Sequence, residues 1–132
     1  MFKLNHISIT VAQRLATVLK KSGTPTENRV LILSPKNQDN KIGSIIVPGS
    51  TKEGVPREGV VIYTGPITED YNTYKGMVQT GAIVTYGLYA GKEVDLWPQV
   101  ENIDDIELSE NNWEFTVLAL NEIIYVSDNK NV

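Results

Sequence analysis

Residues 35–59 read PKNQDNKIGSIIVPGSTKEGVPREG, and this stretch predicts a long loop between two strands. Its centre, residues 45–47, is purely aliphatic, whereas the residues around it are mostly Gly, Pro, Lys, Ser, Asn and Asp, which are typical of loops. Loops longer than about 12–15 residues are usually functional or disordered. We therefore interpret the segment as a linear binding element that becomes ordered on its target. Composition leaves one alternative open, a short edge strand over 42–47 with Ile45 and Val47 directed into a core.

Short apolar runs on both sides of this loop predict a strand-rich body. They are rich in β-branched and aromatic residues and are separated by Gly and Pro, a pattern that favours strands. The polar segment 67–76 is expected to form a hairpin tip, and residues 127–132 a frayed tail. Many short strands without alternating helices indicate an all-β fold, a small barrel or sandwich. The predicted strands are 29–33, 60–63, 82–86, 93–97, 115–118 and 123–126.

The first part of the chain, residues 1–26, is expected to form an extension of the main domain, 27–132. Thr10 and Gln13 have the spacing of a capping box, and apolar residues at helical spacing follow. A short amphipathic helix is therefore predicted over 11–21, ending before Gly23 and Pro25. The alternative is a strand, because Ile7, Ile9 and Val11 alternate with polar residues.

Bulk composition narrows the class of protein. The 132 residues fit one domain, and a net charge of −4 argues against general attraction to nucleic acid or an anionic membrane. The chain has no cysteine, so it forms neither disulfides nor thiolate metal sites, which is compatible with the cytosol. No apolar run is long enough to predict a membrane-spanning helix, and the first ten residues do not have the pattern of a secretory signal.

The residues that usually carry catalysis are scarce, so the protein is predicted not to be an enzyme and no catalytic residues are assigned. The single histidine, His6, has no second histidine or cysteine to act with, and no glycine-rich phosphate-binding motif is present. The carboxylates Asp104, Asp105, Glu107 and Glu110 lack the ligand order of an EF-hand and are interpreted as a solvated acidic loop, so no metal site is predicted. Trp97 and Trp113 could stack on sugars or bases, but core packing is the preferred interpretation.

Five segments in order carry a family resemblance. They are NRVLI at 28–32, GSIIVP at 43–48, GVV at 59–61, TGAIVTY at 80–86 and IIYV at 123–126. Taken together, residues 27–128 resemble the GroES-like co-chaperonins, the lids of the chaperonin ring. Three positions depart from the family pattern: Ser44 replaces a common second glycine, Ala82 the usual aspartate, and Glu58 separates Arg57 from Gly59. Residues 101–112 look like an insertion. Co-chaperonins of large bacterial viruses are similarly divergent, so a bacteriophage origin is a hypothesis for this chain.

The resemblance implies a GroES-like β-barrel with a mobile loop (35–59), assembled as a homo-heptamer that caps a GroEL-type chaperonin and encloses an unfolded client, a capsid protein in the viral case. It also implies a cytoplasmic location and no cofactor, because the chaperonin binds and hydrolyses the ATP; no nucleic acid or membrane partner is expected. By position, the chaperonin-binding residues would be Gly43, Ser44, Ile45, Ile46, Val47 and Pro48. The roof hairpin over the ring, 66–76, would include Glu69, Asp70 and Tyr71. The subunit interface would include Val30, Leu31, Ile32, Ile123, Ile124 and Tyr125.

Simple energetics agree with a binding loop of this kind. Burial of three aliphatic side chains stabilises a complex by roughly 5–9 kcal/mol, and ordering a free segment costs about 2–5 kcal/mol of that. One loop should therefore bind weakly, whereas several loops on one ring gain avidity of about 10²–10⁴. The alternative hypothesis is a structural or ligand-binding β-barrel, such as a virion component, that makes no chaperonin contact.

Overall fold

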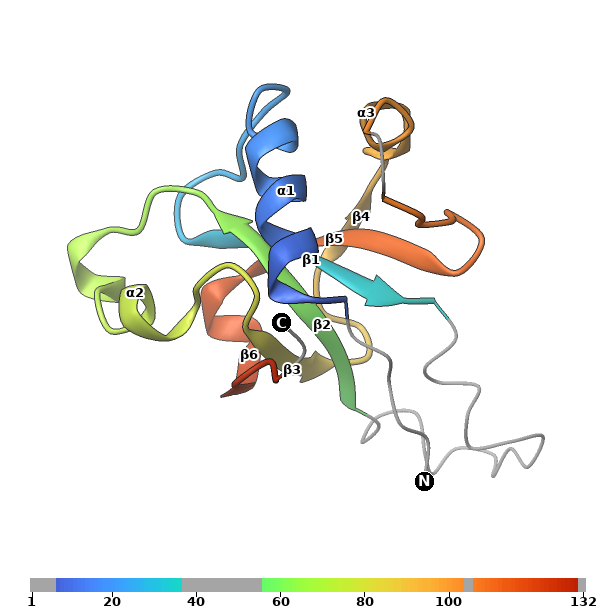
Figure 1. Ribbon diagram of the computed structural model, residues 1–132. Coiled ribbons are helices and arrows are strands. Elements are labelled where there is room, and N and C mark those ends of the chain that lie inside the picture. Colours follow the sequence, from blue (N-terminus) through green and yellow to red (C-terminus); the bar gives the residue numbers. More distant parts are fainter. Residues whose placement is uncertain (1–6, 37–55, 104–105, 131–132) are drawn as a thin grey trace, which may run out of the picture.

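One antiparallel sheet of six strands forms the body of the protein (Figure 1). The computed structural model describes residues 7–36, 56–103 and 106–130. The order across the sheet is β4-β5-β1-β2-β3-β6, so β4 and β6 are its edges. The expectation of a mainly β fold is thus correct, and short helices accompany the sheet. The strands are β1 (Arg29–Pro35), β2 (Pro56–Thr64), β3 (Ile83–Gly87), β4 (Lys92–Val94), β5 (Trp113–Ala119) and β6 (Ile123–Ser127).

β1 lies inside the sheet and is buried on both faces. It pairs with β2 on one side and with β5 on the other. Leu31 and Leu33 belong to the core cluster beneath the first helix, whereas Val30 and Ile32 belong to a second cluster on the opposite face. The continuous apolar run of β1 follows from this position, because a strand that is buried on both faces has no polar side to alternate with.

Helix α1 (Ile9–Leu19) packs across β2 and covers the first core cluster (Figure 1). Leu15 and Leu19 are fully buried on its inner face. Ser8 is the N-cap, and its hydroxyl accepts a hydrogen bond from the backbone of Val11 at 3.2 Å. The predicted cap, Thr10, is therefore wrong by two positions, because a serine one half-turn earlier already satisfies the free N–H group. Among the described helices, none is long and apolar enough to cross a membrane.

The connection between β2 and β3 is helical where a hairpin tip was predicted. It contains a 3₁₀ helix (Glu69–Tyr71) and α2 (Tyr74–Met77), and no strand lies in 66–76. Local backbone hydrogen bonds replace strand pairing here. The Tyr71 N–H donates to the Thr68 carbonyl and the Val78 N–H to the Tyr74 carbonyl, both at 2.9 Å. The Tyr71 and Tyr74 rings stack with centroids 5.8 Å apart. The hairpin prediction is therefore corrected in its secondary structure, although β2 and β3 do pair.

Two further predictions need correction in their local structure, and a third is refined. Trp97 begins α3 (Trp97–Val100) instead of ending a strand, because Pro98 and the Asp95 carboxylate, which accepts from Trp97 N–H at 3.2 Å, favour a helix start. In segment 101–112, Glu107 and Glu110 are exposed as predicted, whereas the aliphatic side chains between the carboxylates pack on the first core cluster, namely Ile103, Ile106 and Leu108. The predicted frayed tail is anchored by buried Asn129, whose side chain donates to Ile7 C=O at 2.9 Å.

Candidate functional site

The predicted chaperonin-binding residues, Gly43, Ser44, Ile45, Ile46, Val47 and Pro48, lie outside the described residues. The structure does describe the two strand ends on either side of segment 37–55, since β1 ends at Pro35 and β2 begins at Pro56. We call these two strand ends the loop base, after the loop predicted for residues 35–59, and take it as the candidate site.

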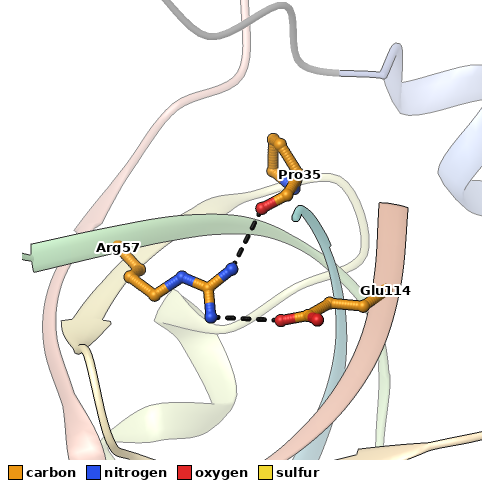
Figure 2. Close-up of polar contacts among 3 residues, drawn as sticks. All are labelled: Pro35, Arg57 and Glu114. Carbon is orange, nitrogen blue, oxygen red and sulfur yellow. Dashed lines mark hydrogen bonds and ion pairs between the residues drawn. The ribbon is translucent and has the colours of Figure 1, made fainter. Parts of the chain in front are cut away.

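An arginine bridges three strands at the loop base. Arg57, on β2, contacts the Glu114 carboxylate on β5 through Nη1 at 3.1 Å and donates to the Pro35 carbonyl on β1 through Nη2 at 3.0 Å (Figure 2). Only 13% of the Arg57 side chain and 16% of the Glu114 side chain are exposed. The contact is a charge-assisted hydrogen bond, because both groups are ionised. Since the pair is largely shielded from solvent, salt weakens it less than it weakens a surface ion pair.

The neighbouring residues hold each end of the loop to the body. On the β1 side, Lys36 N–H donates to Asn112 C=O at 2.8 Å. On the β2 side, a Cβ added to Gly59 would lie 2.9 Å from the Ile32 side chain and 3.2 Å from the Leu33 carbonyl. A larger residue would require the Ile32 side chain and the neighbouring backbone to shift, so glycine suits this close approach of the two strands. The site can therefore hold two chain ends in place.

The described residues offer no arrangement for metal chemistry at this base or elsewhere. No group of three or more His, Cys, Asp and Glu side chains within them is placed to hold a metal ion. Asp104, Asp105 and His6 lie outside the described ranges. Trp97 is 6% exposed and packs on Phe115 with ring centroids 5.0 Å apart, so it fills the core and offers no stacking platform.

The residues predicted at the subunit interface divide into two groups. Val30, Leu31 and Ile32 have exposures of 0, 2 and 0%, and both edges of their strand are already paired. These three residues cannot meet a neighbouring subunit through strand pairing, and that part of the prediction is corrected. In contrast, Ile124 and Tyr125 are 69% and 64% exposed on the edge strand β6, while Ile123 is partly buried.

The predicted roof residues lie on the helical connection described above. Glu69 and Asp70 are exposed and Tyr71 is partly buried. Asn28 anchors this connection: its Nδ2 donates to Thr68 Oγ1, and Thr68 N–H donates to its Oδ1, both at 2.9 Å. Asn28 has a φ of 59°, a left-handed conformation that asparagine tolerates better than most residues.

Sequence reasoning missed the bridge at the loop base. Arg57 was noted only because of its spacing from Gly59, and neither Glu114 nor Pro35 was singled out. Glu114 lies far along the chain and reaches the loop base only because β5 pairs with β1, where Ser34 is opposite Glu114. A single sequence carries no signal for that strand order.

Comparison with known proteins decides the family. Residues 22–126 match the family model for the chaperonin 10 Kd subunit, which covers most of the chain. This chain belongs to the chaperonin 10 family. The protein therefore functions as a co-chaperonin, and co-chaperonins are not enzymes.

Several bacterial relatives support the assignment. This co-chaperonin is 31% identical over 84 residues to co-chaperonin GroES 1 of Rhodopirellula baltica, covering 62% of this chain and 82% of the relative. It is 38% identical over 72 residues to the co-chaperonin GroES of Parabacteroides distasonis, covering 54% and 76%. The corresponding protein of Exiguobacterium sibiricum is 39% identical over 72 residues, covering 53% and 76%. The family membership decides against the alternative of a structural or ligand-binding barrel without a chaperonin role.

Proposed function

We propose that this co-chaperonin caps a GroEL-type chaperonin ring through residues 43–48 and thereby encloses an unfolded client protein. The observation that carries the proposal is the family match over 22–126, which includes the segment with the aliphatic centre 45–47. The body supports such a use, because it presents the two ends of that segment side by side at the base formed by Pro35, Arg57 and Glu114. ATP would be bound and hydrolysed by the chaperonin in the cytoplasm.

The assembled form in this proposal is a ring of seven copies. Each subunit would contribute the edge strand β6, where Ile124 and Tyr125 are exposed apolar side chains. Strand edges pair readily with another chain, and exposed apolar residues mark interaction surfaces. The sheet would close into the GroES-like barrel of the family, and residues 66–76, including Glu69, Asp70 and Tyr71, would lie over the centre of the ring. The relatives named above are bacterial, and a viral origin with a capsid client remains a hypothesis.

The decisive experiment removes the aliphatic centre of the loop. Native mass spectrometry with a GroEL-type chaperonin and ADP or ATP should show a complex for the unaltered protein and none for Ile46→Asp. Two controls accompany it: Ile46→Leu retains an aliphatic group, and Ser50→Asp adds the same charge elsewhere in the loop. Both controls should still bind. A complex of undiminished stability with Ile46→Asp would contradict the proposal.

A further inference from the structure

β1 and β2 approach each other closely near the loop base. Their register runs from Val30 opposite Thr64 to Leu33 opposite Val60. At the loop base β1 also pairs with β5, through Ser34 and Pro35, and β2 with β3, through residues 56–59. Pro35 and Pro56 have no backbone N–H to donate to a ladder at this end. A side-chain contact between the two strand ends therefore adds to the attachment that backbone pairing supplies.

The Arg57 side chain links the two strand ends directly. It comes from β2 and reaches both the Pro35 carbonyl at 3.0 Å and the Glu114 carboxylate at 3.1 Å, so one guanidinium joins β2 to β1 and β5 (Figure 2). A planar guanidinium with several donors in a fixed geometry suits two acceptors on different strands, which a lysine ammonium on a flexible stem does not hold as firmly.

Fixing both ends of a segment matters for binding. A segment whose ends vary in separation and direction loses more conformational freedom when it binds than one whose ends are already placed. In a ring the effect is multiplied, because a twofold loss for each of seven segments amounts to about a hundredfold loss for the whole ring if all engage.

We infer that Arg57 is a positioning residue for chaperonin binding, with Glu114 as its partner: together they fix the separation of the two ends of the 37–55 segment. This inference rests on the proposed function of residues 43–48. Arg57 does not need to touch the chaperonin itself. Its role would be to hold Pro35 and the first residues of β2 at one distance in every subunit.

The first test compares three variants with the unaltered protein. Arg57→Gln removes the ion pair, Glu114→Gln neutralises the partner but keeps a polar side chain, and Arg57→Lys keeps the charge without the fork. Arg29→Gln is the matched control, since Arg29 is exposed at the other end of β1 and bonds to Thr26 Oγ1. We expect Arg57→Gln to lower the affinity of the ring for a GroEL-type chaperonin by about tenfold to a hundredfold, Glu114→Gln and Arg57→Lys by less, and Arg29→Gln not at all.

The second test measures the loop ends directly, which a general loss of stability would not affect. The chain has no cysteine, so nitroxide labels on Lys36→Cys and Pro56→Cys would be the only ones. Their dipolar broadening should report a narrow distance range in the free ring and a wider range after Arg57→Gln, while the ring mass stays unchanged. If Arg57→Gln fails to assemble, the same distance measurement is made on Glu114→Gln, which is the milder change.

The outcomes separate this inference from the proposed function. Wild-type affinity and an unchanged label distance in Arg57→Gln and Glu114→Gln would overturn the positioning role, even if Ile46→Asp abolishes binding. Undiminished binding by Ile46→Asp would instead overturn the proposed function. A lowered affinity together with a widened label distance supports both.

Discussion

The two connections that leave β2 are held in different ways. The connection to β3, residues 65–82, is tied to the body at several points along its length: Gly65 N–H donates to Arg29 C=O at 2.9 Å, Thr80 Oγ1 to Ile62 C=O at 2.7 Å, and Val78 is buried. The connection to β1 is described only at its base, where one arginine joins three strands. One sheet therefore holds its two connections by different means. Burial and backbone hydrogen bonds hold residues 65–82, whereas the charged Arg57 side chain links the two strand ends at the loop base.

The largest expected effect breaks the fixed connection. In Gly65→Ala, the new Cβ would collide with the carbonyl oxygens of Pro25 and Thr26, which are backbone atoms that cannot rotate away. We expect a loss of about 3 kcal/mol or more in the free energy of unfolding, measured by denaturant titration. Gly76→Ala is the matched control, since nothing lies within 4 Å of its added Cβ. Equal stabilities of the two variants would refute this reading of Gly65.

A smaller effect is expected at the anchor of the same connection. Asn28→Ala loses the side-chain hydrogen bonds to Thr68 and places alanine at a φ of 59°, so we expect a loss of about 2–3 kcal/mol in the free energy of unfolding. Asn28→Gly accepts the backbone conformation and should lose only the hydrogen bonds, about 1–2 kcal/mol. Thermal unfolding at matched protein concentration measures both. If the glycine variant proved the less stable, the side-chain and backbone contributions would have to be reassigned.

Loss of the Arg57 contacts should affect chaperonin binding more than it affects the stability of the fold. Arg57→Gln is expected to cost about 1–2 kcal/mol in the free energy of unfolding, less than Asn28→Ala, because the largely shielded Glu114 carboxylate loses its partner but keeps some contact with water. It should nevertheless weaken chaperonin binding more than Asn28→Ala does. Denaturant unfolding and chaperonin affinity, both measured on the Arg57→Gln and Asn28→Ala variants, check this prediction. If the variant with the larger loss of stability also showed the larger loss of affinity, the proposed difference between the two connections would be wrong.

The smallest effect concerns the residue just before the fixed connection begins. Burial raises the pKa of the Tyr63 hydroxyl above its usual value of 10.0, and this hydroxyl donates to the Gly23 carbonyl at 2.6 Å. Because the folded pKa lies above the unfolded one, the stabilisation is complete below about pH 10 and is lost progressively as the pH rises from there toward the folded pKa. Tyr63→Phe should lose about 1 kcal/mol at neutral pH and show a smaller decrease in alkali. Unfolding measured between pH 8 and 11 tests this, and an unchanged alkaline slope would contradict it.

The sequence predicted most strands well, because all but β4 are apolar runs that end at Gly, Pro or polar residues. β1, β2, β5 and β6 all contain the ranges expected for them. Local backbone bonds were harder to foresee. Polar residues at 67–76 suit a turn or a short helix equally, and backbone bonds such as Tyr71 N–H to Thr68 C=O and Val78 N–H to Tyr74 C=O distinguish the two. The N-cap was misplaced because Ser8 and Thr10 are both good capping residues.

The site was predictable only in part, and the reason is the sheet order. The aliphatic centre at 45–47 is visible as a local pattern, whereas Arg57, Pro35 and Glu114 come together only through the β1–β5 pairing. The same limit explains the error over Val30, Leu31 and Ile32. Their pattern indicated a strand, and only the topology shows that both edges of this strand are occupied.

The hydrogen bond from Asn129 to the Ile7 carbonyl has a practical consequence. It joins Asn129 to the residue two positions before α1, so a fluorescent group attached at residue 130 would lie near the start of that helix.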